Sequence, residues 1–128
     1  MADKEFWSYY DYEVLLGRLV DKLKNDERMK RIKAVYGVPR GGLPIAVHLS
    51  HYLKLKFSRD LFDDIVENTL IVDDIAHTGR TLARGSNLYL TATLFYRPES
   101  IVKPDFYLEE ATKWIVFPWE TGNEVPNR

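Results

Sequence analysis

The stretch Thr69-Leu-Ile-Val-Asp-Asp-Ile-Ala-His-Thr-Gly-Arg-Thr-Leu82 decides the fold. Its apolar run from Leu70 to Val72 is typical of a central parallel strand covered on both faces. Asp73 and Asp74 follow, where this strand is expected to stop. The loop from Ala76 to Thr81 then offers backbone N–H groups, two hydroxyls and one glycine, and a helix beginning at its end would add a positive helix terminus. Such a loop suits a phosphate group. Two carboxylates beside it suit a sugar diol, a divalent cation or both.

An alternative for this stretch is an ordinary strand, turn and helix in which the two aspartates cap the turn. The acid pair alone fits this alternative. The small and hydroxyl-bearing residues that follow the pair favour a ligand site instead.

Composition describes a small protein with one core. At 128 residues the chain fits a single domain, residues 1–128, and its net charge of −1 argues against nucleic-acid binding. The absence of Cys excludes disulfides, thiolate metal sites and Cys nucleophiles, and fits a reducing, cytoplasmic compartment. No apolar run is long enough to span a membrane, and the first residues do not resemble a signal peptide.

Strands alternate with helices along the chain, which predicts an α/β fold with a mainly parallel sheet flanked by helices. Ligands are then expected over the carboxyl ends of the strands. The first helix should bury an apolar stripe and be capped by Ser8 or Asp11, and the second should bury Leu43, Ala46, Val47 and Leu53. His48 and His51 are read as surface or packing residues because no third zinc ligand is evident. The expected elements are helices at 11–24 and 43–52 and strands at 34–38, 53–57, 70–72, 91–96 and 114–117.

A second motif is Val35-Tyr-Gly-Val-Pro-Arg-Gly-Gly-Leu-Pro44. Gly41 and Gly42 allow the backbone to approach a ligand closely and to take unusual dihedral angles. Arg40 offers a planar, permanently charged donor for phosphate. Glycine turns before helices are common, but this turn follows a predicted parallel strand upstream of the acid pair, which favours a second phosphate site.

A third motif is Trp114-Ile-Val-Phe-Pro-Trp-Glu120. It fits an aromatic strand buried in the core. It also fits a platform for a nucleobase, because stacking on an aromatic side chain contributes about 1–3 kcal/mol. Both interpretations stay open at this point.

The ordered motifs resemble those of the type I phosphoribosyltransferases, whose site for phosphoribosyl pyrophosphate is an apolar strand, two acids and a loop ending in Thr-Gly-x-Thr. The resemblance implies that Asp73 and Asp74 face the ribose hydroxyls and that Arg40 and Gly41 bind pyrophosphate. It implies a cis peptide between Pro39 and Arg40, as in several relatives, and a homodimer. Mg²⁺ would bridge the ligand, near the carboxylates of Asp74 and Glu120. The 5′-phosphate would be wrapped by Ala76, His77, Thr78, Gly79, Arg80 and Thr81.

The third motif is similar to that of the microbial xanthine-guanine-hypoxanthine phosphoribosyltransferases. This resemblance implies a small C-terminal hood in which Trp114 stacks on a purine and the backbone of Ile115 contacts the base edge. Arg97 stands where the family usually places Lys against the purine 6-oxo group. The implied reaction is purine salvage, in which N9 of guanine, xanthine or hypoxanthine displaces pyrophosphate from phosphoribosyl pyrophosphate.

Two departures from the family leave the activity open. His77 stands where 6-oxopurine enzymes have an Asp that takes the proton from purine N7. A neutral imidazole can accept that proton, so His77 is a candidate catalytic base; the alternative is that only its backbone N–H acts. The segment between Leu53 and Leu70 is also too short for the lid of the relatives, which excludes water. A catalytically weak regulatory protein that binds nucleotide or phosphoribosyl pyrophosphate is therefore the second hypothesis, and a structural domain without a ligand is the third.

Overall fold

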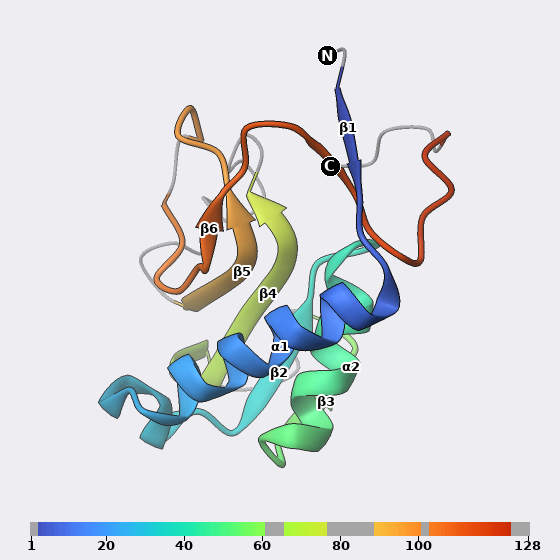
Figure 1. Cartoon of the computed structure of the whole chain (residues 1–128). Coiled ribbons are helices and arrows are strands. Elements are labelled where there is room, and N and C mark those ends of the chain that lie inside the picture. Colours follow the sequence, from blue (N-terminus) through green and yellow to red (C-terminus); the bar gives the residue numbers. More distant parts are fainter. Residues whose placement is uncertain (1–2, 61–65, 77–88, 101–102, 124–128) are drawn as a thin grey trace.

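The computed structural model describes residues 3–60, 66–76, 89–100 and 103–123 (Figure 1). Five parallel strands form the main sheet in the order β3-β2-β4-β5-β6, and β1 pairs with β7, also in parallel, in a separate two-stranded sheet. The predicted α/β class is confirmed. The strands are β1 (Lys4–Phe6), β2 (Ala34–Gly37), β3 (Lys56–Ser58), β4 (Thr69–Ala76), β5 (Leu90–Tyr96), β6 (Glu109–Glu110) and β7 (Trp114–Val116). The helices are α1 (Tyr9–Lys24) and α2 (Gly42–Tyr52), with the 3₁₀ segments η1 (Glu27–Arg31) and η2 (Val66–Asn68).

The order of the strands reverses between β2 and β4. From β2 the chain passes through α2 to β3 on one side, whereas β4, β5 and β6 follow on the other side. Open α/β sheets bind ligands at the carboxyl ends of the strands beside such a reversal. The glycine turn after β2 and the acid pair in β4 both lie there.

The helix α1 packs as predicted from its apolar spacing. Ser8 and Asp11 form a reciprocal cap, in which Ser8 Oγ accepts from the Asp11 N–H at 3.0 Å and Asp11 Oδ2 accepts from the Ser8 N–H at 2.9 Å. The helix therefore begins at Tyr9, slightly earlier than expected. Its buried residues are Tyr12, Leu15, Leu16, Leu19, Val20 and Leu23.

The buried face of α2 differs from the prediction. Leu43 and Val47 are exposed, whereas Ile45 and Leu49 enter the core beside Ala46. The helix ends in a left-handed residue, Lys54, with the Leu55 N–H bonded to the Ser50 carbonyl at 3.0 Å. The alternation from Leu53 to Phe57 thus belongs partly to a helix end, and the edge strand β3 begins only at Lys56.

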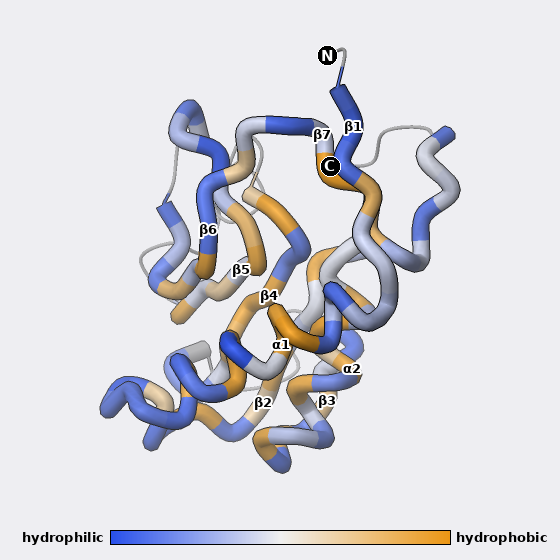
Figure 2. Tube along the Cα trace, in the orientation of Figure 1, coloured by the Kyte–Doolittle hydropathy of each residue, from blue (hydrophilic) through white to orange (hydrophobic). Residues whose placement is uncertain are grey.

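The strand β4 is longer than predicted. It continues through the acid pair to Ala76, because β5 offers partners as far as Phe95 and Tyr96. Figure 2 shows the hydrophilic acid pair interrupting an otherwise hydrophobic strand. The expected strands 91–96 and 114–117 are both present, as β5 and β7, but they do not follow one another directly. The short β6 intervenes, and β7 leaves the main sheet to pair with β1.

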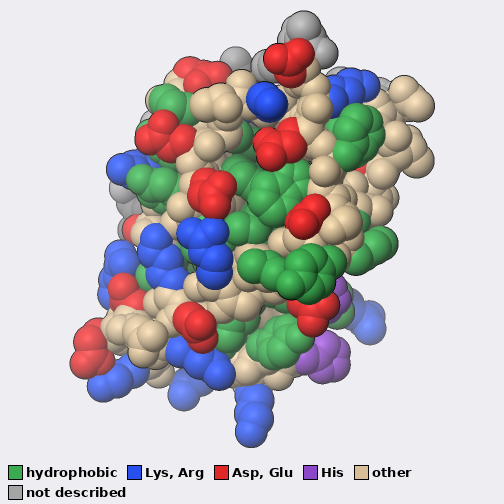
Figure 3. All heavy atoms as spheres, viewed as in Figure 1, with side chains coloured by type: hydrophobic (Ala, Val, Ile, Leu, Met, Phe, Trp, Pro, Cys, Tyr) green, Lys and Arg blue, Asp and Glu red, His purple; other side chains and the backbone are tan. Residues whose placement is uncertain are grey.

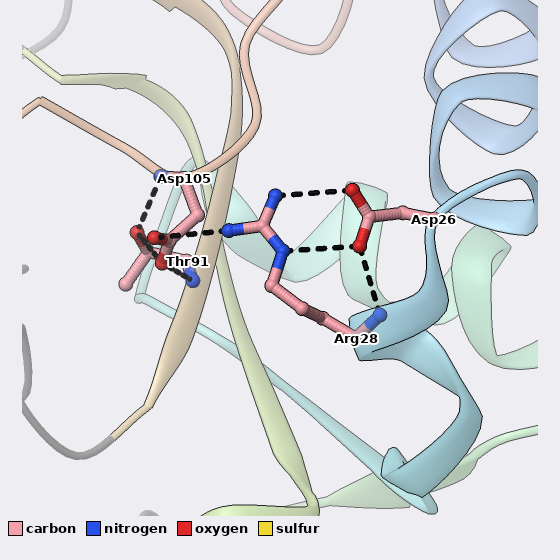
Figure 4. A network of polar contacts seen from close by, with 4 residues as sticks. All are labelled: Asp26, Arg28, Thr91 and Asp105. Atoms are coloured by element: carbon pink, nitrogen blue, oxygen red, sulfur yellow. Dashed lines mark hydrogen bonds and ion pairs between the residues drawn. The ribbon is translucent and has the colours of Figure 1, made fainter.

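A polar network ties η1 to the amino-terminal end of β5 (Figure 4). Arg28 donates to both carboxylate oxygens of Asp26 at 3.0 Å and lies 3.7 Å from Asp105, which accepts from the Thr91 N–H at 2.9 Å. The hydrogen bonds from Arg28 lower the pKa of Asp26. This network lies at the end of the sheet opposite the acid pair, so it belongs to the scaffold.

Candidate functional site

The two aspartates of β4 have different surroundings. Asp73 is half-buried, whereas Asp74 is 0% exposed. The Asp74 N–H donates to Asp73 Oδ1 at 2.8 Å, and the Ile75 N–H donates to Asp74 Oδ1 at 2.7 Å. Because neighbouring residues of a strand point to opposite faces, the two side chains leave β4 on different sides. The expectation that both carboxylates face the ribose hydroxyls stays a prediction. Asp73 is the accessible carboxylate.

The glycine turn after β2 packs directly against the acid pair. A Cβ on Gly41 would collide with the Asp74 carboxylate, and a Cβ on Gly42 would collide with the Val72 carbonyl. Gly41 has φ −63° and ψ −27°, which are ordinary right-handed values. The expectation of unusual dihedral angles is therefore wrong for Gly41. These glycines are needed because the turn approaches β4 so closely.

The same turn presents positive charge beside β4. Arg40 is exposed, and the peptide between Pro39 and Arg40 is cis, as predicted. Gly41 occupies the N-cap position of α2 and has no side chain with which to cap the helix. The positive end of the helix dipole and the Arg40 guanidinium both favour an anion at this place. Neither Arg40 nor Gly41 is shown to touch a ligand, so their pyrophosphate role stays a prediction.

The third motif forms the strand β7, which is held by β1. The Trp114 N–H donates to the Asp3 carbonyl at 3.2 Å, and the Trp7 N–H donates to the Val116 carbonyl at 2.9 Å. The Trp114 side chain is partly exposed, whereas the Ile115 side chain is 1% exposed. Because backbone groups alternate along a strand, the N–H and C=O of Ile115 point away from β1. They therefore take no part in the pairing of β7 with β1, and their contact with a base edge stays a prediction.

Arg97 brings β7 to the carboxyl end of the main sheet. Its side chain is buried, and its Nη2 donates to the carbonyl of Lys113, the residue before Trp114, at 2.8 Å. Its backbone N–H donates to the carbonyl of Ala76, the last residue of β4, at 3.1 Å. Arg97 thus links the ends of β4 and β5 to the start of β7. The Arg97 guanidinium lies beside the backbone that leads into Trp114.

Glu120 closes its own turn. Its Oε1 accepts from the Phe117 N–H at 3.0 Å, and its N–H donates to the Phe117 carbonyl at 2.9 Å. At least part of this carboxylate is thus used for local structure, and its role near a metal stays a prediction.

Aromatic rings connect the C-terminal motif to the rest of the molecule. The Trp119 ring stacks on the Phe117 ring, with 5.2 Å between the ring centroids, and packs edge-on against the Tyr12 ring, with 5.0 Å between the centroids. The Tyr12 hydroxyl lies 2.7 Å from His48 Nδ1. Burial, with a smaller contribution from Tyr52, raises the pKa of Tyr12, so its phenol stays protonated within this hydrogen bond. His48 is therefore a packing residue and His51 is exposed, as predicted.

The N-terminal segment is the part of the site that sequence reasoning missed. The Trp7 ring meets the Phe95 ring edge-on at 5.4 Å, and Lys4 Nζ donates to the Gly122 carbonyl at 2.7 Å. The available signal was the pair Phe6-Trp7 directly before the helix cap at Ser8. Two aromatic residues outside a helix indicate packing, but they do not identify the partner.

The comparisons with known proteins agree with this architecture. No protein-family model matches the chain. A purine phosphoribosyltransferase from Pyrococcus horikoshii has a solved structure that matches with a TM-score of 0.79 and 28% identity, over 98% of this chain and 99% of that one. This chain has the type I phosphoribosyltransferase fold. The resemblance found in the sequence motifs is thereby confirmed.

Two further proteins are similar to this chain. A xanthine-guanine phosphoribosyltransferase from Desulfotalea psychrophila is 27% identical, over 89% of this chain and 82% of the relative. A xanthine-guanine-hypoxanthine phosphoribosyltransferase from Helicobacter pylori has the same fold, with a TM-score of 0.79 at 22% identity, over 94% of this chain and 95% of that one. None of the helices in the described part of the chain is long and apolar enough to cross a membrane.

The phosphate loop of this fold lies mainly outside the described residues. Ala76 is described and buried at the end of β4, whereas His77, Thr78, Gly79, Arg80 and Thr81 are not described. Within the described ranges no three carboxylates or histidines gather as a metal site. Mg²⁺ is commonly held by one or two carboxylates together with substrate phosphates. The half-buried Asp73 fits that arrangement, whereas the fully buried Asp74 is covered by Gly41.

Proposed function

We propose that this protein is a purine phosphoribosyltransferase that converts a 6-oxopurine and phosphoribosyl pyrophosphate to a nucleotide and pyrophosphate. The bond from C1′ to pyrophosphate breaks, the bond from C1′ to purine N9 forms, and the base loses one proton. The observation that carries this proposal is the link made by Arg97 between β4, β5 and the start of β7. It brings a candidate base platform to the strand end that carries the acid pair.

Each proposed role follows from the chemistry of the residue. The Asp73 carboxylate accepts hydrogen bonds from the ribose hydroxyls, and Arg40 with the amino end of α2 binds pyrophosphate. Bound Mg²⁺ would neutralise part of the diphosphate charge, and Asp73 is the described carboxylate best placed to hold it. Trp114 stacks on the purine, and the Ile115 backbone pairs with its edge. Arg97 is a permanently charged, planar donor beside the start of β7, and a cation of this kind suits the 6-oxo group of the purine.

A second candidate is a regulatory protein that binds the same ligands with little turnover. The observation that favours it is the short connection from β3, which ends at Ser58, to β4, which begins at Thr69. This connection lacks the length for a long lid over the reacting centre, and water would then compete for it. The replacement of the family Asp by His77 points the same way.

Pyrophosphate release separates the two candidates. With Mg²⁺ and phosphoribosyl pyrophosphate, we expect steady turnover with guanine, xanthine or hypoxanthine and much slower release with adenine or uracil. Asp73→Asn is the matched variant, because it removes charge without changing shape, and it should weaken binding of phosphoribosyl pyrophosphate while leaving the melting temperature unchanged. Calorimetric binding without base-dependent turnover would identify the regulatory protein. The absence of any binding would overturn both candidates.

We also propose that the protein is a homodimer and that it is cytoplasmic. The family resemblance suggests a homodimer, and large apolar side chains are exposed on both helices, including Tyr9, Tyr10 and Val14 on α1. Figure 3 shows hydrophobic side chains gathered across the face on which α1 lies. Light scattering would give twice the mass of one chain. The absence of Cys supports a cytoplasmic site.

A further inference from the structure

The strand β1 is the only described strand that pairs with β7. Without a partner strand, the backbone groups of the three-residue strand β7 would bond to water, and β7 would not be held in one conformation. The two strands lie side by side in register, with Glu5 opposite Ile115. The path of the proposed base-binding segment is therefore fixed by residues at the other end of the chain.

The register also decides which backbone groups of β7 face outward. The bonds from Trp114 to Asp3 and from Trp7 to Val116 flank the pair, so Trp114 and Val116 face β1 and Ile115 faces away. A slip of one residue would turn Ile115 toward β1 and direct Trp114 and Val116 outward. The orientation of the Ile115 N–H and C=O thus depends on β1.

The strand β1 is anchored at both of its ends. Lys4 Nζ bonds to the Gly122 carbonyl at 2.7 Å, beyond the C-terminal end of β7. The Trp7 ring packs on Phe95 at 5.4 Å, and Phe95 in turn lies 6.0 Å from Phe117. Phe95 precedes Arg97 by two residues. The packing of Trp7 on Phe95 therefore joins the two-stranded sheet to the carboxyl end of β5.

We propose that β1 and Trp7 position the purine. This inference rests on the proposed function. They act through Trp114 and Ile115 and set the affinity for the base, without contributing to the binding of phosphoribosyl pyrophosphate at β2 and β4. The N-terminal segment is then a positioning element for base recognition, built from the end of the chain opposite to the base-binding strand.

A proline substitution and a matched alanine control test this proposal. In the register, the N–H of Glu5 faces β7, and proline removes the N–H. Glu5→Pro should raise the KM for guanine or hypoxanthine at least tenfold, with the KM for phosphoribosyl pyrophosphate changed less than twofold. Glu5→Ala, the matched control, keeps this N–H and removes only an exposed side chain, so it should leave both constants within twofold of wild type. Equal effects of the two variants, or a parallel loss for both substrates, would overturn the proposal.

Binding measurements separate this proposal from the proposed function. Calorimetry with guanosine monophosphate and with phosphoribosyl pyrophosphate should show a selective loss of nucleotide binding in Glu5→Pro. If wild-type protein binds neither ligand, the proposed function fails; if it binds both and Glu5→Pro behaves as wild type, only the role of β1 fails. If Glu5→Pro does not fold, Lys4→Met removes the bond to Gly122 more gently. It should then weaken nucleotide binding two- to fivefold with no effect on phosphoribosyl pyrophosphate, and unchanged binding would overturn the proposal.

Discussion

The sheet reversal between β2 and β4 carries the proposed phosphate side of the site, and the two-stranded sheet of β1 and β7 carries the proposed base side. At the reversal, each motif is a contiguous stretch in which a strand, a turn and the charged residues follow one another. In the two-stranded sheet, Glu5 pairs with Ile115, near the opposite end of the chain. The proposed phosphate side can therefore be predicted from short stretches of sequence. The proposed base side depends on the pairing of β1 with β7, which no short stretch of sequence predicts.

The two regions also differ in what each can contribute to catalysis. In the proposed reaction, groups at the reversal face the atoms whose charge changes, so their loss should reduce turnover. In the proposed base site, groups of the C-terminal motif hold a base that keeps its shape, so their loss should reduce affinity. Four substitutions break or sharpen this contrast.

The largest effect is expected at the phosphate side, for His77→Ala. If the imidazole takes the purine proton, kcat should fall by about 10²–10⁴, the usual contribution of a positioned general base. His77→Asp should restore turnover and move the acid limb of the pH profile to lower pH, because an unperturbed carboxyl has a pKa about 2.6 below that of an imidazole. His51→Ala, on the exposed side of α2, is the control. A His77→Ala protein with wild-type kcat and pH profile would leave only the backbone N–H with a role.

A smaller and selective effect is expected at the base side, for Trp114→Ala. Loss of stacking should weaken purine binding by about 1–3 kcal/mol, with the KM for phosphoribosyl pyrophosphate unchanged. Because the side chain is partly exposed, the melting temperature should fall less than for a fully buried Trp. Trp114→Phe retains an aromatic plane and should recover most of the affinity. Global unfolding without a selective change in purine KM would assign Trp114 to the core.

At the reversal itself, Gly41→Ala should destabilise the fold by about 1–3 kcal/mol, the usual cost of overpacking. The added methyl group would collide with the buried Asp74 carboxylate, so the turn or the strand must shift. Chemical denaturation measures this loss, and binding of phosphoribosyl pyrophosphate should weaken with it. An alanine accepted at no cost in stability would show that the turn does not need its close approach to β4.

The smallest effect is expected away from both regions, for Gly17→Ala. This glycine is exposed on α1 and has open space where a Cβ would lie. Alanine should therefore stabilise the protein by about 0.5–1 kcal/mol, through helix propensity alone. The same denaturation experiment measures it, with both KM values expected to equal those of wild type. A loss of stability comparable to that of Gly41→Ala would mean that neither effect is specific to its site.

Sequence patterns succeeded where one local interaction dominates. The apolar residues of α1 recur at helical spacing between polar ones, and the stripe that they form is buried as expected. The pattern failed for α2, because apolar residues surround most of that helix and periodicity cannot choose a face. Leu43 and Val47 were assigned to the core and are exposed.

Within the acid-pair motif, too, sequence predicted some features and missed others. Sequence identified Asp73 and Asp74 as unusual for a buried strand and placed them beside a phosphate loop. It could not show that β4 continues past them, because the continuation depends on the pairing of Ile75 with Phe95 and of Ala76 with Tyr96. Nor could it show that Gly41 covers Asp74, since that contact joins two separate strands.

The sequence by itself determined the fold class, the order of the motifs and the chemistry that each motif can perform, because strand, turn and helix propensities act over a few neighbouring residues. The tertiary structure was needed to show which aspartate is accessible, why Gly41 and Gly42 are glycines, and that β1 pairs with β7. Those features are contacts between segments far apart in the chain. They arise when the whole core packs, and no local pattern encodes them.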